Sequence, residues 1–511
     1  MLPLKVLEKI RPKKLRILFV STEAEPFAIS GGLGTVMHSL PRALRKLGHD
    51  ARLMIPRYLS VDPQKWQLET AYEGLQVPTE NQKGPKELIC NVKRYDPKTP
   101  DDPVTTYFLE NKEYYEQRAN IYGYADDSVR WALLCRGTLE FLKKSDWVPE
   151  VIVVTDWHSG RLPNLLKTVY QGDPKLSQIA TVLSIHNLRA QGSFDYRFLT
   201  EADIDDGYSL LPSFEDPRLL KVNGMRRGII YADVINTVSE TYAKEITTPI
   251  YGQGLDELLR KRQDVLTGII NGIDYSNWIP ETDPLVPHKF SVKNLPARAK
   301  NKAALQKRFE LPVTNEAFVV GIVARMVPQK GIDLLETIIQ QLLQELPLQL
   351  VVLGEGESRI MELFLNLKKN FPEDIAAHFK FEAELPHLIF AGADAVLIPS
   401  RFEPSGLTQM EAMAYGCIPI VRKTGGLGDT VEDYSPEKDA GTGFVFEKID
   451  AQSLMIAIVR AYESFRHKAE WQKLQKRAML KDFSWEYSAK LYVDLFEKAV
   501  RLRQKTNSKS G

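Results

Sequence analysis

Short runs of β-branched and other apolar residues alternate along this chain with longer stretches in which apolar residues recur every three or four positions. The short runs predict buried strands, and the longer stretches predict amphipathic helices. In the first half of the chain we expect six such strands, at residues 15–20, 51–55, 104–109, 151–155, 180–185 and 233–237. Regular alternation of strand and helix is typical of a parallel sheet covered by helices.

A second series of strands follows, at residues 318–323, 348–353, 395–399, 418–421 and 444–446. Between the two series, residues 277–309 contain four prolines that interrupt the pattern, as expected for a hinge. After residue 450 only helical patterns remain. We therefore predict an α/β protein with two Rossmann-like, doubly wound domains of parallel sheet that face each other across a cleft.

The expected domain organisation has five parts. They are an N-terminal extension (1–14), a first domain (15–285), a second domain (286–480), a C-terminal helix that packs back on the first domain (481–503) and a disordered polar tail (504–511).

Composition narrows the possible functions. The 511 residues include 67 basic and 66 acidic side chains, and a net charge of +1 gives no reason to expect binding to nucleic acid or to a membrane surface. No apolar run approaches the roughly 18 to 20 residues that a membrane helix needs. Three scattered cysteines, Cys90, Cys135 and Cys417, show no metal-ligand spacing and favour a reducing, cytoplasmic setting.

Ligands of open parallel sheets bind beyond the carboxyl ends of the strands, so the residues that follow each strand are the candidates for a site. The segment AISGGLGTV (28–36) follows the first strand and precedes a helical pattern. Ser30, Gly31 and Gly32 could bring backbone N–H groups close to a phosphate. Alone, such a glycine pair is as often a tight turn.

In the second domain, Arg325 and Lys330 follow the strand at 318–323 and suit a diphosphate. The alternative, on this segment alone, is a pair of solvated surface cations. The denser segment IPSRFEPSGLTQMEAMAYGC (398–417) places backbone amides at the start of a helix, where they favour an anion. These amides belong to Gly406, Leu407 and Thr408.

Two glutamates, Glu403 and Glu411, flank that helix start. Carboxylates accept paired hydrogen bonds from vicinal hydroxyls, so the pair could bind a sugar and a ribose; the alternative is a loop acid and a solvated helix face. Gly425 and Gly426, in KTGGLGD (423–429), repeat the glycine pair and are expected to form another wall of the cleft.

In the first domain, His158 in TDWHSG and His186 with Asn187 in SIHNLRAQG follow successive strands. A lone histidine is more often structural than catalytic. Two of only eight histidines at the carboxyl ends of adjacent strands are better explained by a site.

The chain resembles the bacterial glycogen synthases and plant starch synthases, which are retaining glucosyltransferases of the GT-B type. The resemblance extends from about residue 15 to about residue 500. It rests on ordered motifs that include FVSTEAEPFAISGGLG, TDWHSG, IHNLRAQG, GIINGIDYSNWIPETDP, RMVPQKGIDLL, PSRFEPSGLTQ, TGGLGDTV and DFSW.

The resemblance implies a reaction and a set of roles. Glucose would pass from a nucleotide-glucose, ADP-glucose before UDP-glucose, to the non-reducing end of an α-1,4-glucan, with no metal or other cofactor. Arg325 and Lys330 would hold the diphosphate, Glu403 the transferred glucose, and the amides of Gly406 and Leu407 the phosphate.

In the first domain, the resemblance implies further contacts. His158 would lie near the glucose 6-hydroxyl, and Tyr115 would stack on the nucleobase. Further contacts would come from Asp126, His186, Asn187 and Gln191.

Four residues depart from the family pattern at the donor site. Ile29 stands where lysine is usual, Thr35 where aspartate is usual, Ser405 replaces a cysteine, and Glu411 replaces a tyrosine. These changes leave two alternatives open: a related retaining glycosyltransferase with another donor or acceptor, or a catalytically impaired glucan-binding protein. The sequence does not determine the oligomeric state.

Overall fold

The computed structural model describes residues 14–192, 205–380 and 382–510. Residues 1–13 of the expected N-terminal extension lie outside this range. The chain divides into two compact units, which we call unit 1 (Met1–Asn236, Gln253–Leu266 and Ala489–Gly511) and unit 2 (Thr237–Gly252 and Thr267–Ser488). The chain therefore crosses between the units after residues 236, 252, 266 and 488.

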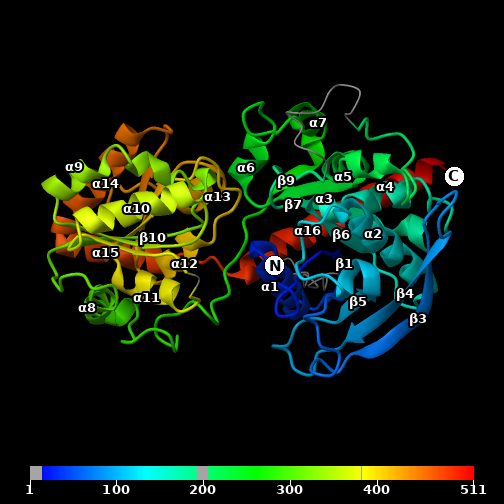
Figure 1. The fold of residues 1–511 in the computed structure, drawn as a ribbon, viewed down its shortest axis with the longest axis horizontal. Helices are drawn as coiled ribbons and strands as arrows, with labels where there is room; N and C mark the ends of the chain where they lie inside the picture. Colours follow the sequence, from blue (N-terminus) through cyan, green and yellow to red (C-terminus); the bar gives the residue numbers. More distant parts are fainter. Residues whose placement is uncertain (1–13, 193–204, 381, 511) are drawn as a thin grey trace, which may run out of the picture. The chain divides into compact units, whose positions relative to one another are not determined.

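A twisted sheet with strand order β3-β4-β5-β2-β1-β6-β7-β8-β9 forms the centre of unit 1 (Figure 1). The predicted strands lie in this sheet: β1 (Arg16–Val20), β2 (Asp50–Pro56), β5 (Thr106–Glu110), β6 (Val151–Thr155) and β7 (Ala180–Ile185), which pair in parallel, and β8 (Val234–Thr237) beside β7. These strands are almost continuously apolar because helices cover both faces of a parallel sheet. In β1, for example, Ile17 to Val20 are fully buried.

An antiparallel hairpin that the apolar runs did not predict extends the edge of this sheet (Figure 1). It consists of β3 (Glu69–Pro78) and β4 (Glu87–Tyr95), and β4 pairs with β5. Most residues of the hairpin strands are exposed or partly exposed, so they lack the continuous apolar run used to find the other strands. A three-residue strand, β9 (Leu266–Gly268), completes the order.

The helices of unit 1 lie between its strands in the sequence, and α3 begins directly after β6. They are α1 (Gly32–Lys46), α2 (Asp127–Lys144), α3 (Asp156–Ser159), α4 (Arg161–Lys167), α5 (Gly224–Tyr231) and α7 (Asp256–Lys261). Helix α16 (Trp485–Ser510) ends the chain and contacts the centre of this sheet, where the rings of Phe496 and Phe19 meet edge to face at 6.3 Å.

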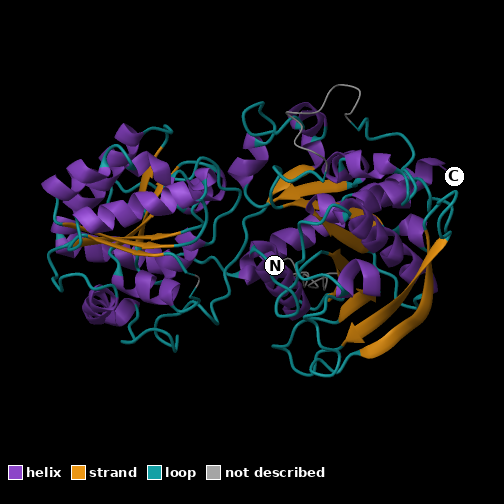
Figure 2. Ribbon diagram, in the orientation of Figure 1, coloured by secondary structure: helices purple, strands orange, loops and turns teal. Residues whose placement is uncertain are grey.

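Unit 2 contains a fully parallel sheet of order β12-β11-β10-β13-β14-β15. The strands are β10 (Phe318–Val323), β11 (Leu348–Leu353), β12 (Ile375–His378), β13 (Ala395–Ile398), β14 (Ile418–Arg422) and β15 (Phe444–Phe446). Helices cover both faces, as Figure 2 shows by colour. They are α6 (Glu240–Glu245), α8 (Arg298–Arg308), α9 (Ile339–Glu345), α10 (Ser358–Asn370), α11 (Leu385–Gly392), α12 (Thr408–Ala414), α13 (Gly425–Thr430), α14 (Ala451–Arg466) and α15 (Lys468–Met479).

All eleven predicted strands are present, and the predicted α/β class with two parallel-sheet domains is confirmed. The predicted hinge at residues 277–309 is wrong, because this segment packs within unit 2. Trp278 stacks on His387 with ring centroids 4.1 Å apart, and Val286 and Phe290 are buried in the core. The prolines interrupt secondary structure there without separating two units.

Two further boundaries differ from expectation. Residues 237–252 and 267–285, assigned from the sequence to the first domain, group with unit 2. Residues 504–510 continue helix α16, although a disordered tail was predicted. Arginine, lysine and glutamine are good helix formers, and Asn507 Nδ2 donates to Ser177 O at 3.2 Å. No helix in the described ranges is long and apolar enough to cross a membrane.

Candidate active site

A cavity of about 70 Å³ lies at the carboxyl ends of β10 and β13 in unit 2. We call it the β13 cavity. Three groups of residues line it: the end of β10 (Val323, Ala324), the loop that follows (Lys330, Ile332), and the end of β13 with the start of α12 (Leu397, Ile398, Pro399, Ser400, Glu403, Gly406, Leu407, Thr408, Gln409). The structure therefore brings together Lys330, Glu403 and the predicted amide segment.

Lys330 and Glu403 form an ion pair in this cavity. Lys330 Nζ lies 2.6 Å from Glu403 Oε2, and Ser400 Oγ donates to the same oxygen at 3.0 Å. Glu403 is buried, and its side chain is therefore held in one orientation by these two contacts. No described residue donates to Glu403 Oε1, so that oxygen can accept a hydrogen bond from a hydroxyl of a ligand.

Free amides line the β13 cavity, and a further cation, Arg325, follows the lining residue Ala324 in the sequence without itself lining the cavity. Arg325 follows β10, its side chain is exposed, and no described carboxylate pairs with it. The N–H groups of Gly406, Leu407 and Thr408 precede or begin α12 and donate to no described acceptor. Cations and unsatisfied amides at a helix start favour an anion such as a phosphate.

Glu411 lies one turn into α12. Desolvation raises the pKa of its carboxyl from 4.5 to about 8, so at pH 7 most of it is protonated. Ionisation of this group is therefore coupled to anything that binds beside it.

The glycine pair of KTGGLGD supports the site without presenting amides to a ligand. Gly425 N donates to Glu245 Oε1 at 3.1 Å, and Gly426 N donates to Glu403 O at 3.1 Å. A Cβ on Gly426 would lie 1.9 Å from Ser405 O, so α13 can approach the Glu403 loop only without a side chain there. We correct the predicted role of Gly425 and Gly426 from ligand contact to support of the loop.

Helices α6 and α13 cap each other. Asp429 in α13 accepts from Thr241 N at 2.9 Å and from Thr241 Oγ1 at 2.6 Å, at the start of α6. In the other direction, Glu245 at the end of α6 accepts from Thr424 Oγ1 at 2.8 Å and from Gly425 N, at the start of α13. Each helix thus satisfies the first N–H groups of the other.

In unit 1, the first glycine loop has an internal anion. Glu23 Oε2 accepts from Ser30 N at 2.6 Å and from Gly31 N at 2.9 Å, while Tyr122 donates its hydroxyl to Glu23 Oε1 at 2.8 Å. Glu23 is buried. Two of the amides expected to hold a phosphate are therefore occupied by a carboxylate of the same chain. Gly32 remains exposed at the first position of α1.

The two histidine motifs lie side by side because β6 and β7 are adjacent parallel strands. Asp156 joins them: its Oδ1 accepts from His186 N at 2.8 Å and from Asn187 N at 3.2 Å. Burial raises the pKa of Asp156 to about 7. Burial lowers the pKa of His158 to about 3 and that of His186 to about 4, so both rings are neutral at pH 7.

His158 retains an unused polar atom. Its ring lies against Trp157 and Tyr122, with centroids 4.3 Å and 5.1 Å away, and its Nδ1 has no partner among the described residues. A neutral imidazole can donate or accept there, which keeps His158 a candidate for binding a hydroxyl.

The structure does not support ligand contacts by three residues. Tyr115 is fully buried and donates its hydroxyl to Arg130 O at 2.8 Å, so the prediction that its ring stacks on a nucleobase is wrong. Gln191 uses both ends of its amide internally, with Asn223 Nδ2 at 2.7 Å and Gln253 O at 2.8 Å. Asp126 pairs with Arg118 at 2.6 Å.

Sequence reasoning missed Ser400, Glu23, Asp156 and Glu245. Ser400 could have been predicted from the sequence, because it follows a predicted strand and lies three residues before Glu403. The partners of Glu245 are about 180 positions away, and no local pattern predicts such a pairing.

Comparison with known proteins gives a consistent result across the chain. Residues 16–261 match the family model of the starch synthase catalytic domain, and residues 304–477 match that of glycosyl transferases group 1. The chain is 40% identical over 491 residues to a glycogen synthase of Thermotoga petrophila, covering 95% of this chain and 99% of that protein. It is 39% identical over 493 residues to the glycogen synthase of Geobacillus stearothermophilus, covering 96% and 99%.

Solved structures give the same picture. The catalytic domain of starch synthase IV from Arabidopsis thaliana, solved with ADP and acarbose bound, is similar with a TM-score of 0.81 and 30% identity, over 96% of this chain and 100% of that one. The sucrose-phosphate synthase of Thermosynechococcus elongatus shares the fold, with a TM-score of 0.57 and 18% identity over 95% of this chain and 99% of that one.

Proposed function

Because this chain belongs to the glycogen and starch synthase family of glucosyltransferases, we propose that it transfers glucose from ADP-glucose to the non-reducing end of an α-1,4-glucan with retention of configuration. Family membership makes the chain a glycosyltransferase that uses a nucleotide-sugar donor and a glucan acceptor. The choice of ADP is supported by the similar starch synthase IV domain, which binds ADP.

The observation that carries the proposal is the β13 cavity, where Lys330 pairs with buried Glu403 at 2.6 Å beside three free amides. Breaking the anomeric bond places negative charge on the leaving diphosphate and positive charge on the sugar. Fixed cations and amides lower the barrier when they stabilise the charge that develops on the phosphates. We assign this role to Arg325, Lys330 and the N–H groups of Gly406 to Thr408.

Glu403 is proposed to bind the transferred glucose through Oε1. Its pairing with Lys330 and Ser400 keeps the carboxylate from turning toward the phosphates. We find no second carboxylate on the walls of this cavity, in the part of the chain that the structure describes, that could serve as a nucleophile. Front-face attack by the acceptor hydroxyl, with the departing phosphate taking its proton, is therefore the mechanism we propose for retention.

His158 and Glu411 are assigned supporting contacts. We propose that His158, kept neutral by burial, binds a hydroxyl of the transferred glucose, and that Glu411 binds the ribose hydroxyls. His186 and Asn187, held by Asp156, remain predictions as contacts near the acceptor. The cytoplasmic location expected from the sequence also remains a prediction.

The test uses the purified full chain with maltooligosaccharides and either ADP-glucose or UDP-glucose, and follows glucan chain length. We expect elongation with ADP-glucose, and a loss of about 10²- to 10³-fold in kcat for Lys330→Ala and for Glu403→Gln. Lys423→Ala is the matched control, because Lys423 is an exposed lysine of the same unit that pairs with exposed Glu447.

Three outcomes contradict parts of the proposal. Faster elongation with UDP-glucose would overturn the choice of donor. Full activity of Lys330→Ala would overturn the site. Glucan binding without elongation by any donor would show an impaired glucan-binding protein instead of an enzyme.

A further inference from the structure

A second and larger cavity lies in unit 2 at the end of the sheet where β13 begins, away from the β13 cavity. Its volume is about 180 Å³, and we call it the α8–α15 cavity. Asp394, directly before β13, lines this cavity, whereas Ser400 and Glu403, after β13, line the other. At about 3.3 Å per residue, the six positions from 394 to 400 separate the two sites by roughly 20 Å.

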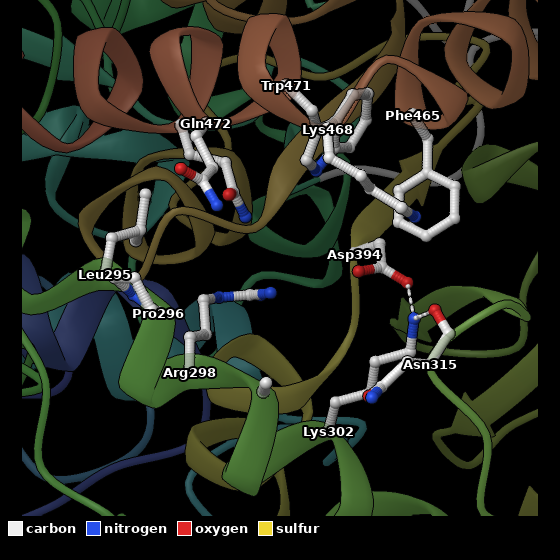
Figure 3. A pocket seen from close by; sticks show the side chains of 12 residues that line it. Leu295, Pro296, Arg298, Lys302, Asn315, Asp394, Phe465, Lys468, Trp471 and Gln472 are labelled. Carbon is white, nitrogen blue, oxygen red and sulfur yellow. Dashed lines mark hydrogen bonds and ion pairs between the residues drawn. The ribbon is translucent and has the colours of Figure 1, made fainter.

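Figure 3 shows how the side chains of the α8–α15 cavity are arranged. Arg298 and Lys302 project from α8, while Lys468, Trp471 and Gln472 project toward them from α15. The remaining lining residues are Leu295, Pro296, Ala299, Asn315, Asp394, Phe465 and Gln475.

The charges on these walls do not cancel. Asp394 is the one carboxylate among the described lining residues, and Lys302 Nζ neutralises it at 2.7 Å. Arg298 is buried, and its Nε and Nη2 donate to backbone carbonyls of Tyr415, Phe390 and Ala393. Those acceptors are neutral, and no described carboxylate forms a direct ion pair with Arg298, which Asp394 attracts only from a distance. Lys468 adds a further cation, which is exposed and is attracted by the carboxylates of Asp394 and Glu316.

One donor on these walls is buried with no described acceptor, the indole N–H of Trp471. The side chain of Trp471 is only 4% exposed, yet its Nε1–H has no hydrogen-bond partner among the described residues. A buried donor without an acceptor is costly, and most such groups in folded proteins are paired. Lys468 Nζ lies 3.1 Å from the centroid of the Phe465 ring, and its other hydrogens are free to reach an anion.

We propose that the α8–α15 cavity binds a small phosphate monoester, with the phosphate held by Arg298, Lys468 and the Trp471 N–H, and the organic part against Phe465 and Leu295. Donors and cations without a matching acceptor favour a dianionic oxyanion. The apolar walls favour an organic substituent over free phosphate. The volume exceeds the roughly 30 Å³ of a water molecule and accommodates a compact ester.

The position of Arg298 connects this site to the other cavity. Arg298 Nε donates at 3.0 Å to the carbonyl of Tyr415, the residue that caps the C-terminus of α12. The same helix begins at Thr408, which lines the β13 cavity. A ligand that draws on the Arg298 guanidinium therefore acts on α12, and we expect it to change the KM for the donor. This last expectation rests on the proposed function, whereas ligand binding itself does not.

The binding test uses the full chain, with glycerol 3-phosphate and inorganic phosphate as probes and titration calorimetry as the readout. We expect saturable binding of glycerol 3-phosphate with a Kd of about 1 mM or tighter. Lys468→Ala and Trp471→Phe should each weaken it by about tenfold, since each removes one donor. Lys473→Ala, an exposed lysine of α15 that pairs with Glu470, is the matched control and should bind as the parent does.

Lys330→Ala distinguishes the two cavities. Retained glycerol 3-phosphate binding in this variant supports the proposal, and lost binding would place the anion in the β13 cavity and overturn it. Binding unaffected by Lys468→Ala and Trp471→Phe, or no saturation at all, would also overturn it. Equal affinity for inorganic phosphate would overturn the ester assignment. Calorimetry does not require transfer activity. The binding of glycerol 3-phosphate can therefore be interpreted even if the proposed function is wrong.

Discussion

The tetrapeptide GGLG occurs twice in this chain, once in each unit, and the two copies have different structural roles. Gly31 to Gly34 follow β1, and Gly425 to Gly428 follow β14. Both copies begin a helix, and both have a glutamate from elsewhere at the helix start: Glu23 in unit 1 and Glu245 in unit 2.

The surroundings of the two copies differ sharply. Gly31 and Gly32 are exposed, and a Cβ on either would meet nothing within 4 Å. Gly425 and Gly426 are buried, and a Cβ on them would lie 2.0 Å and 1.9 Å from the carbonyls of Glu403 and Ser405. The first copy therefore leaves open surface at a helix start, while the second allows two segments of backbone to approach. The same signal in the sequence has two physical causes.

The flanking residues sharpen this contrast. Two positions before the glycines stand Ile29 in the first copy and Lys423 in the second, and one position after them stand Thr35 and Asp429. The second copy thus carries the lysine and the aspartate that the family pattern places in the first. In the second copy Asp429 caps α6 and Lys423 pairs with Glu447, so both have structural partners.

The largest expected difference comes from adding one methyl group to equivalent glycines. Gly426→Ala places a Cβ against the backbone of Ser405, and we expect a loss of about 3 kcal/mol in the free energy of unfolding. Gly32→Ala, with open space around it, should stay within about 0.5 kcal/mol of the parent. Urea unfolding measures both, and equal effects would show that the two copies do not differ in packing.

Replacing the two capping glutamates should give a smaller difference between the copies in the free energy of unfolding. Glu23→Ala leaves two backbone donors, Ser30 N–H and Gly31 N–H, without an acceptor, while the Tyr122 hydroxyl keeps Thr22 Oγ1 at 2.6 Å, and we expect a loss of about 2 kcal/mol. Glu245→Ala should cost about 1 kcal/mol, because Glu245 Oε2 is buried without a described partner and its removal relieves that penalty. A larger loss for Glu245→Ala in urea unfolding would reverse this ranking.

Transferring the lysine from the second copy to the first tests the departure at Ile29. This side chain is 54% exposed, so Ile29→Lys should leave the free energy of unfolding unchanged. A charge-assisted hydrogen bond to a phosphate should lower the KM for the donor about tenfold. Lys423→Ile is the matched control, and we expect no change in its donor KM. An unchanged KM in Ile29→Lys would show that the isoleucine is not a lost phosphate contact.

The smallest effect concerns titration in unit 2. The pKa of Glu411 is raised to about 8, so the carboxylate that would accept from ribose hydroxyls forms only as pH rises through that value. We expect the donor KM to fall about threefold between pH 6.5 and 8.5, and Glu411→Gln to abolish this dependence. Stability changes in the opposite direction, because the folded state favours the neutral acid and loses free energy as pH rises above about 4.5. A pH dependence retained in Glu411→Gln would assign it to another group.

Much of the fold could be predicted because buried parallel strands read as continuous apolar runs. The runs at 151–155 and 180–185 coincide with β6 and β7 residue for residue. The hairpin of β3 and β4 could not be found this way, since one of its faces is exposed and residues such as Glu69, Glu73 and Glu87 interrupt the run. Strand β12 was missed because its residues, IAAH, include only one β-branched residue and end in a histidine, so they do not form an apolar run.

The site was predictable to the extent that strand order determines it. Lys330 and Glu403 meet because β10 and β13 are neighbours, and their carboxyl ends open at one edge of the sheet. Tyr115 was assigned by resemblance alone, and its burial could not be read from a segment with polar neighbours on both sides. Glu23 and Glu245 act on amides through tertiary contacts, which depend on packing that no local pattern encodes.

The mutual capping of α6 and α13 has a consequence for synthesis on the ribosome. Glu245, the acceptor, is synthesised about 180 residues before its donor Gly425. Thr241, a donor, precedes its acceptor Asp429 by a similar number of residues. At about 5 to 20 residues per second, that separation corresponds to roughly 9 to 36 s. During this interval α6 has been synthesised, but α13, which caps it, has not. We therefore expect residues 237–252 to be a site where a chaperone binds the nascent chain or a protease cleaves it.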